Sequence, residues 1–474
     1  MKAKSIFLIW YTVFYCFSTY SKPLHAVKVY YTQNNLEKNV PAQPVKNCTP
    51  TSDTNQPAVG CITINTTQRF QTMAGIGAAF SEIGTLAFAS LPAKAQNAIV
   101  KNLFDIKNGA GFSFCRLPVG SSDFATSAYS YAETAEDYQM KEFSLSRDEK
   151  SIIPMVKKAL KANPKLSLFA SPWSPPAWMK KSGKMDGGGD NSRLRDEENI
   201  YKAYALYFEK YILGYKKLGI QIARLCPQNE MDLSPKYPGC LMEPAEIINF
   251  ITQNLAPQFK NSRITTEIWP GTFREKPKAP YAKECMKDEA FRKVITGLGI
   301  QYFNPKSIDS LVQIYPQLRL MHTEAICYNS KNDASQAQKR YSEILGIFNS
   351  GCDTFCYWNM LLDENQKSGW DWAQNSLLTI NRATHEIIYN PDYQPVYIVS
   401  KFVKPGSVRV EAKFKALNDS KFSTFVSAFI NKNKSITVLA QNINEMPMPI
   451  DLNIDGKVIR IELPAFADCA VFCK

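Results

Sequence analysis

Short apolar runs alternate with helix-like stretches from residue 70 to about residue 388, and this alternation limits the folds open to the chain. Such a pattern is typical of buried parallel strands that are covered by helices. Eight strands over about 320 residues are the number and size expected of a (β/α)8 barrel. The eight runs are 73–80, 112–119, 166–171, 220–226, 264–269, 298–303, 318–323 and 354–360. Helix-like stretches between them include 94–103, 152–160, 200–218 and 334–348.

The two ends of the chain differ from its middle. Segments 27–31 and 62–65 are β-like runs around a loop rich in Pro, Asn and Thr. From Pro395 onward, short strands and turns follow closely, which predicts a small β-sandwich that the N-terminal strands can join. We therefore predict an α/β fold, a (β/α)8 TIM barrel with a side β-sandwich built from both chain ends. The predicted domains are N-terminal strands over 22–69, the barrel over 70–390 and the C-terminal sandwich over 391–474, with strands near 407–410, 422–430, 435–441, 449–454 and 458–463.

Residues 1–21 have the pattern of a secretory signal peptide. A basic start precedes an apolar run at 6–17, which is shorter than the roughly 20 residues that span a bilayer. Thr19 and Ser21 are small residues at the −3 and −1 positions of a cleavage after Ser21. The alternative is an uncleaved anchor. We expect a secreted or lumenal protein, in an extracellular, periplasmic or lysosome-like compartment.

The charge balance argues against a nucleic-acid partner. The chain has 56 Lys and Arg against 43 Asp and Glu, a net charge of +13. The basic residues are scattered in pairs such as Lys157-Lys158 rather than gathered into an arm, so we interpret them as a solvated surface.

Cysteine and histidine usage predicts neither a metal site nor a cofactor. Only three His residues occur and no Cys-x-x-Cys motif is present, so a zinc site built from Cys and His is not expected. In an oxidising compartment, Cys48 could pair with Cys61, and Cys469 with Cys473.

Two carboxylates follow predicted barrel strands at the end where barrel active sites lie. The fourth run leads into Pro227-Gln228-Asn229-Glu230, and the seventh ends in Thr323-Glu324. Strands four and seven lie across the barrel from each other, so both side chains can reach one substrate. A single Glu at such a place is as readily a solvated surface residue. Two of them at this register are what glycoside hydrolysis needs, because one protonates the leaving oxygen and the other stabilises or bonds the anomeric carbon.

Other strand ends carry residue types that bind sugars. Trp173 and Trp358 directly follow or end runs three and eight, so we place them in the site, whereas Trp178 is interpreted as core packing. Arg116 lies on run two, followed by Asp123. Arg116 could hold Glu324 as the anion, and the charge of Glu324 would raise the pKa of Glu230.

The chain resembles glycoside hydrolase family 30, the glucosylceramidase family. The resemblance rests on segments that follow in order along most of the chain: GIGAAFSEIGTLAF, FSFCRLPVGSSDFATSAYSYAE, SPWSPPAW, CPQNE, MHTEA and YWNMLLD. It implies a retaining mechanism with Glu230 as acid/base and Glu324 as nucleophile, and no metal or organic cofactor. It also implies that Asn229 bonds the sugar 2-hydroxyl. Asp123, Trp173 and Trp358 would line the sugar subsite.

On the predicted sixth strand this chain has Gln301-Tyr302-Phe303, whereas glucosylceramidase-like members of the family carry His-Trp-Tyr. The difference changes a ring of hydrogen-bonding side chains in the pocket. We place Gln301 and Tyr302 among the substrate-binding residues. Glucosylceramide and β-1,6-linked glucan are the leading substrates, and β-xylosides or β-fucosides are the alternative; a glycolipid substrate would add peripheral membrane contact. A catalytically silent glycan-binding barrel is a further alternative, although it would be expected to lack one carboxylate. A protease or esterase is disfavoured, because the barrel segment has neither a Gly-x-Ser-x-Gly elbow nor an HExxH helix.

Overall fold

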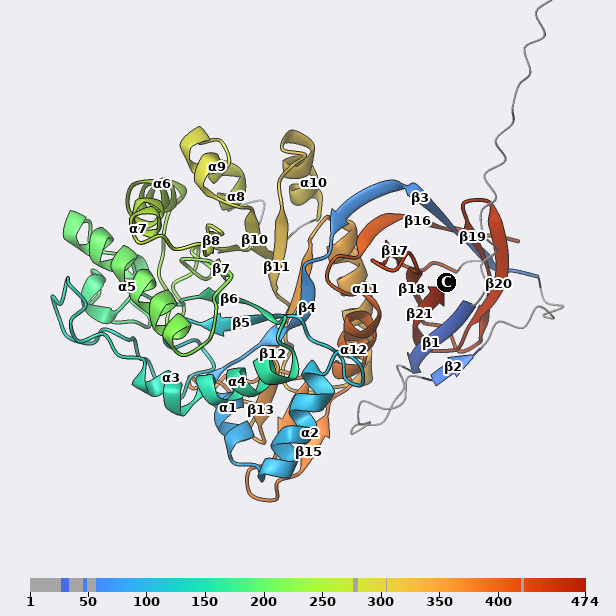
Figure 1. Cartoon of the computed structure of the whole chain (residues 1–474), viewed down its shortest axis with the longest axis horizontal. Helices are drawn as coiled ribbons and strands as arrows, with labels where there is room; N and C mark the ends of the chain where they lie inside the picture. Colours follow the sequence, from blue (N-terminus) through green and yellow to red (C-terminus); the bar gives the residue numbers. More distant parts are fainter. Residues whose placement is uncertain (1–26, 34–45, 49–56, 276–279, 304, 419–421) are drawn as a thin grey trace, which may run out of the picture.

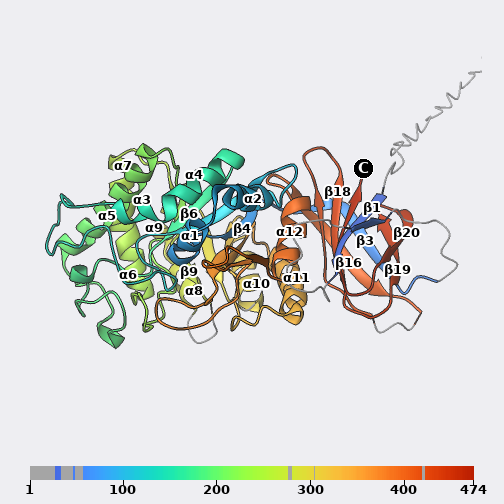
Figure 2. The ribbon, with the colours of Figure 1, turned by 90° about the horizontal axis from the view of Figure 1, so that it is seen from below.

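The computed structural model describes residues 27–33, 46–48, 57–275, 280–303, 305–418 and 422–474 (Figure 1). These residues form two lobes that lie side by side in both views: a barrel surrounded by helices and a smaller lobe of strands (Figures 1 and 2). The predicted signal peptide over 1–21 lies outside the described residues. Within the described part of the chain, no helix is long and apolar enough to cross a membrane.

Two parallel sheets make up the barrel. One has the strand order β12-β4-β5-β6-β7-β8 and the other β11-β10-β9. Isolated parallel bridges between Asn229 and Thr272 and between Ala325 and Tyr357 join the sheets at both seams, so the barrel is nearly closed. The strands are β4 (Gly75–Ala79), β5 (Phe114–Pro118), β6 (Ser167–Ser171), β7 (Arg224–Leu225), β8 (Glu267–Ile268), β9 (Thr272–Phe273), β10 (Leu298–Gln301), β11 (Leu320–Glu324) and β12 (Thr354–Asn359).

Each predicted apolar run contains or overlaps a barrel strand, so the predicted barrel is confirmed. The fifth barrel position is divided into β8 and β9 around Trp269-Pro270-Gly271. Proline at this point has no N–H to donate to a neighbouring strand, which interrupts the hydrogen-bonded ladder.

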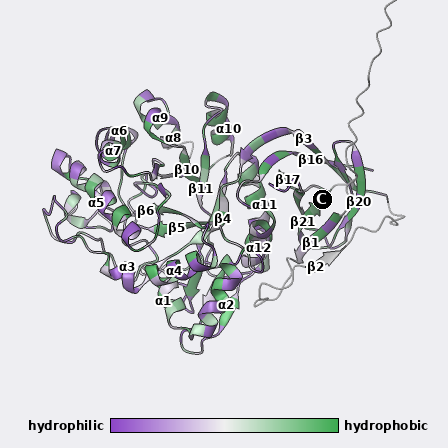
Figure 3. Ribbon diagram, viewed as in Figure 1, coloured by the Kyte–Doolittle hydropathy of each residue, from purple (hydrophilic) through white to green (hydrophobic). Residues whose placement is uncertain are grey.

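Helices cover the outside of the barrel, and Figure 3 shows them with both hydrophilic and hydrophobic residues, as expected of amphipathic helices. In α5, Tyr204, Tyr207, Phe208, Tyr211 and Tyr215 recur at helical spacing and are buried against the barrel. The helices are α1 (Glu82–Ala89), α2 (Ala93–Phe104), α3 (Ser146–Lys150), α4 (Ile152–Ala162), α5 (Glu198–Lys217), α6 (Pro244–Asn249), α7 (Ala256–Asn261), α8 (Tyr281–Cys285), α9 (Glu289–Val294), α10 (Pro305–Ile314), α11 (Ala334–Asn349) and α12 (Tyr393–Phe402).

The second lobe is one sheet that combines both chain ends, in the order β2-β1-β21-β18-β17-β16-β3-β19-β20. The sheet curls so that β1 contacts β20 and encloses its own apolar core, to which Val29, Ile62, Val410 and Leu452 belong. The predicted side β-domain is therefore confirmed. Its strands are β1 (Val27–Gln33), β2 (Lys46–Cys48), β3 (Gly60–Thr72), β16 (Val408–Ala416), β17 (Val426–Ile430), β18 (Ile436–Asn442), β19 (Met448–Ile454), β20 (Lys457–Leu463) and β21 (Ala467–Cys473).

Three features differ from the sequence prediction. Helix α12 forms where only short strands were expected, and it packs with α11 between barrel and sheet (Figure 1). A small sheet of β13 (Leu361–Asp363), β14 (Leu378–Ile380) and β15 (Ile387–Tyr389) follows the barrel, and β21 was not predicted.

The predicted disulfide between Cys469 and Cys473 does not form, so this prediction is wrong. Both residues lie on β21, and four residues of extended strand separate their Cα atoms by about 13 Å, against a disulfide limit of about 7 Å. Cys61 carries no disulfide, and the side chain of its predicted partner Cys48 lies outside the described residues.

Candidate active site

Glu230 and Glu324 stand at the carboxyl ends of barrel strands. Glu324 is the last residue of β11, and Glu230 follows β7 after a short turn. Glu230 has a φ of +40°, and Tyr302 directly after β10 has a φ of +50°. The left-handed region is costly for residues other than glycine, and such strain gathers at functional sites.

Two donors bond the carboxylate of Glu324. Arg116 on β5 donates from Nη1 to Oε2 at 2.5 Å, and the Tyr302 hydroxyl donates to Oε1. Arg116 is fully buried, so its charge faces Glu324 with little solvent screening.

The same guanidinium fixes Asn229. Arg116 donates from Nη2 to Asn229 Oδ1 at 2.7 Å and to Ser171 Oγ at 2.7 Å. The Thr272 hydroxyl also donates to Asn229 Oδ1, at 2.7 Å. With both bonds on the oxygen, the Asn229 amide has a fixed orientation, and its Nδ2 donates no hydrogen bond to a described residue. That nitrogen is therefore available to a ligand hydroxyl.

Gln301, the last residue of β10, contacts the other carboxyl. It donates from Nε2 to Glu230 Oε1 at 3.1 Å, while its Oε1 accepts from Thr323 Oγ1 at 2.9 Å. Gln301 also pairs in register with Glu324 across β10 and β11, and its side chain lowers the pKa of Glu324. One amide thus lies against both carboxyl groups.

The environments of the two carboxyls separate their roles. Burial, and then the charge of Glu324, raises the pKa of Glu230 to about 7. Burial also raises the pKa of Glu324, but Arg116 and Tyr302 oppose this shift. A cation and a hydroxyl bond Glu324, while Glu230 accepts from a neutral amide and Arg274 acts on it by charge alone; these contacts favour the charge on Glu324 and the proton on Glu230.

Trp173 and Trp358 pack beneath the carboxylates. Their rings stack with centroids 4.8 Å apart and planes at 29°, and Arg116 Cζ lies 4.4 Å from the Trp173 ring and 5.2 Å from that of Trp358. Both indoles are almost fully buried. They form the floor of the site rather than an exposed platform.

Asp123 has an unsatisfied carboxylate oxygen. It is 3% exposed, and its Oδ1 accepts no hydrogen bond from any residue that the structure describes. Burial raises its pKa well above the usual value, and the charges of Glu324 and Glu230 add to this. Buried polar atoms are rarely left unpaired, so this oxygen fits a donor that the substrate brings.

The structure thus brings the nine residues singled out in the sequence to one site. They are Arg116, Asp123, Trp173, Asn229, Glu230, Gln301, Tyr302, Glu324 and Trp358. Trp178, expected in the core, is half-buried and donates from Nε1 to the Ala132 carbonyl oxygen at 2.9 Å.

Sequence reasoning missed Thr272 and Tyr237. Thr272 follows the fifth apolar run, and this position at a strand end is the sequence signal that indicates it. Tyr237 lies in an irregular loop and has no periodic signal; its pKa is raised by burial and then by Asp123, Glu230 and Glu324.

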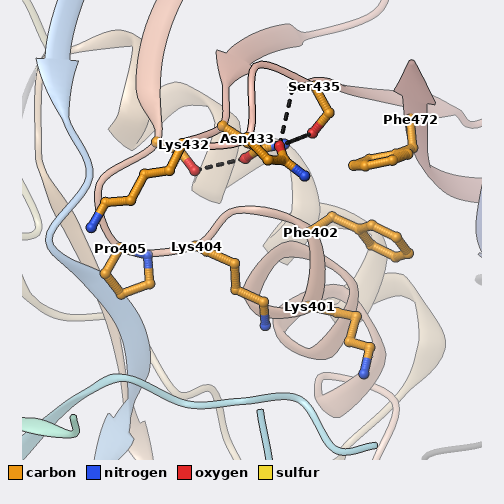
Figure 4. Close-up of a pocket in the computed structure, with 10 residues that line it drawn as sticks. Lys401, Phe402, Lys404, Pro405, Lys432, Asn433, Ser435 and Phe472 are labelled. Carbon is orange, nitrogen blue, oxygen red and sulfur yellow. Dashed lines mark hydrogen bonds between the residues drawn. The ribbon is translucent and has the colours of Figure 1, made fainter. Parts of the chain in front are cut away.

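A pocket of about 260 Å³ lies away from this site, at the end of α12 (Figure 4). Lys401 and Lys404 line it, but Figure 4 shows their side chains directed away from Asn433 and Ser435. Their ammonium groups donate to the backbone oxygens of Gly109 and Ser400, each at 3.0 Å.

Comparison with known proteins gives the family. The model of the glycosyl hydrolase family 30 TIM-barrel domain matches residues 73–403. Putative glucosylceramidase 4 of Caenorhabditis elegans is 30% identical over 421 residues, which are 81% of this chain and 77% of the relative. The solved structure of SrfJ from Salmonella typhimurium shares the fold, with a TM-score of 0.84, 23% identity and coverage of 94% of this chain and 99% of that one.

A second solved structure, the endo-beta1,6-glucanase BT3312, has a TM-score of 0.83 and 26% identity and covers 95% of this chain and 99% of its own. The family match spans well over half of the chain and includes both glutamates. The chain belongs to glycosyl hydrolase family 30 and is an O-glycosyl hydrolase.

Proposed function

We propose that the protein is a retaining β-glycoside hydrolase that cleaves β-glucosidic bonds by double displacement. Glu324 is the nucleophile and Glu230 the acid/base. The observation that carries the proposal is the asymmetry of the pair: Arg116 and Tyr302 bond Glu324, while the pKa of Glu230 is raised to about 7.

In the first step, Glu324 Oε attacks the anomeric carbon as Glu230 gives its proton to the leaving oxygen. The C–O bond to the leaving group breaks, and a glycosyl ester of Glu324 forms. Asn229 Nδ2 donates to the sugar 2-hydroxyl, and Asp123 Oδ1 accepts from another hydroxyl of the same ring.

In the second step, Glu230 acts as the base. Esterification removes the negative charge of Glu324, so one cause of the raised pKa of Glu230 disappears. Glu230 then accepts a proton from water, the hydroxide oxygen bonds the anomeric carbon, and the ester bond to Glu324 breaks. Each step inverts the carbon once, and the product retains the β configuration.

Glucosylceramide and β-1,6-linked glucan are the leading substrates. The names of the similar proteins, a putative glucosylceramidase and an endo-beta1,6-glucanase, support these two classes. β-Xylosides and β-fucosides are the alternative, and a silent glycan-binding barrel is disfavoured because both carboxylates are in place. From the leader pattern in residues 1–21, we propose a secreted or lumenal enzyme, with peripheral membrane contact if the substrate is a glycolipid.

A substrate panel tests the proposal. Purified protein is incubated with 4-nitrophenyl β-glucoside, β-xyloside and β-fucoside, and with glucosylceramide and β-1,6-glucan. We expect turnover of a β-glucoside and of one natural substrate, with the variant Glu324→Gln inactive as the control for contaminating enzymes. Absence of turnover on the whole panel would contradict the proposed function.

A further inference from the structure

Two aromatic side chains outside the predicted site form a stacked pair. The rings of Tyr237 and Trp372 have centroids 5.6 Å apart and planes at 26°. Tyr237 is half-buried, whereas Trp372 is 41% exposed. Together the two rings form an aromatic surface that is partly open to solvent.

A tight hairpin holds Trp372 in place. Its backbone N–H donates to Ser368 Oγ at 3.1 Å, and its carbonyl oxygen accepts from the Ser368 N–H at 2.8 Å. Lys367 pairs with Ala373 in an isolated bridge and with Asp371 in an ion pair of 2.7 Å. Because the turn is already ordered, little backbone freedom is lost when a ligand binds the indole.

Hydrogen bonds and a β-bridge connect the pair to the loops around the carboxylates. In the same hairpin, the Gly369 N–H donates to the carbonyl oxygen of Asp123 at 3.2 Å. On the other side, Trp370 Nε1 donates to Asp186 at 3.3 Å, and Asp186 bridges to Pro238, the neighbour of Tyr237. The aromatic pair therefore lies on the rim of the site, between the Asp123 loop and the loop after Glu230.

The rim and the floor of the site differ in what they can contact. Trp173 and Trp358 are buried under Arg116 at the sugar that is attacked, so they offer little face to a second ring. Trp372 is accessible, on the same side as Tyr237 and the acid/base loop. The leaving group departs toward the acid/base, which is the position that this rim can reach.

The surroundings of Trp372 select the chemistry of that leaving group. Lys367 and Asp371, in the same turn as Trp372, form an exposed ion pair, and Trp370 donates to Asp186. An alkyl chain would have to lie against these charges, which disfavours burial there. A sugar places its C–H face on the indole and its hydroxyls toward the charged groups.

We propose that Tyr237 and Trp372 form a leaving-group subsite that stacks on a second sugar ring, so that the preferred substrate is a β-linked oligosaccharide or polysaccharide. This inference rests on the proposed hydrolase function. Trp372 is a specificity-determining residue here and takes no part in bond cleavage.

The test compares a substrate that has a second ring with one that has none. For the wild type and Trp372→Ala, kcat and KM are measured on a β-1,6-linked glucose trisaccharide and on β-glucosyl fluoride. We expect kcat/KM on the trisaccharide to fall about tenfold, mainly through KM, because the lost contact is a binding contact. Turnover of the fluoride should stay within about twofold, since fluoride cannot reach the rim.

Three further variants control for structural effects. Tyr237→Phe keeps the ring and should retain trisaccharide activity, whereas Tyr237→Ala should lose it. Phe425→Ala removes a 56% exposed ring in the side domain and should change kcat/KM on neither substrate.

The outcomes distinguish failure of the sugar subsite from failure of the proposed hydrolase function. If the wild type hydrolyses the fluoride but not the trisaccharide, the sugar subsite alone is overturned. The same conclusion follows if Trp372→Ala loses both activities equally or loses neither. A Trp372→Ala variant impaired on glucosylceramide but not on the trisaccharide replaces the sugar with a lipid leaving group. A wild type inactive on both sugars and on the rest of the panel overturns the hydrolase function itself, and the subsite with it.

Discussion

Arg116 and Glu324 form a buried ion pair at 2.5 Å between two strands that lie far apart around the barrel, β5 and β11. The arginine has no solvent exposure, and its remaining donors bond Ser171 and Asn229. One side chain therefore orients the carboxylate that we propose as nucleophile and the amide beside the acid/base.

Removing Arg116 is expected to damage stability and activity together. Arg116→Ala leaves Glu324 as an uncompensated buried charge, which typically costs about 3–5 kcal/mol of the free energy of unfolding. Protonation of Glu324 would remove this buried charge, but a protonated carboxyl is a poor nucleophile. Urea denaturation and kcat measure the two effects. The control is Lys293→Ala, which breaks an exposed pair with Glu289 and should cost less than about 1 kcal/mol. A cost for Arg116→Ala equal to that of the control would contradict this prediction.

Glu324→Ala should lower turnover by at least about 10⁴-fold, because the covalent route is lost. Sodium azide should partly restore turnover of an activated aryl glycoside, since a small anion can occupy the vacated space. The product would be the α-glycosyl azide, formed by one inversion and identified by NMR. Unchanged activity of Glu324→Ala would exclude the nucleophile role.

Glu230→Ala should discriminate between leaving groups. Substrates with poor leaving groups need protonation and should lose about 10²–10⁴-fold, while a dinitrophenyl glycoside, which needs none in the first step, should lose far less in that step. Pre-steady-state measurement of phenol release isolates the step. Similar losses on both substrates would argue against an acid role.

The pH profile follows from the same carboxyl. Glu230 must be protonated to act as an acid, and its pKa is raised to about 7. We therefore expect kcat/KM to be retained below pH 7 on this limb and to fall about tenfold per unit well above it. The alkaline limb should disappear in Glu230→Ala with an activated substrate. If that limb persists in the variant, another group produces it.

The stereochemical outcome tests the pair as a whole. Carboxyls about 5–5.5 Å apart give two inversions and the β-anomer first, whereas a separation of about 6.5–9.5 Å admits a water and gives the α-anomer. The shared contact of both carboxyls with Gln301 favours the short distance. Proton NMR before mutarotation reads the first anomer. The α-anomer would refute the retaining mechanism.

The barrel was predictable because its strands are buried on both faces and appear as continuous apolar runs. Strand-end residues such as Glu230 and Glu324 then followed from topology. Helix α12 was missed because the pattern from Pro395 onward is dominated by short strands and turns; Pro395 itself lies in the first turn of the helix, where proline is tolerated. Tyr237 and Trp372 were missed because they lie in loops, where position depends on tertiary hydrogen bonds rather than on periodicity.

The pairing of β1 with β21 bears on how the protein is made. All seven residues of β1 pair with β21, and the whole barrel is translated between these two strands. Strand β1 therefore remains without this partner until β21 has been synthesised. Contacts of such long sequence separation form slowly, so completion of the side domain should be a late folding event. A chain that terminates before β21 would expose one edge of β1 and one of β18, and we expect it to be recognised as unfinished by chaperones and proteases even though its catalytic residues are all present.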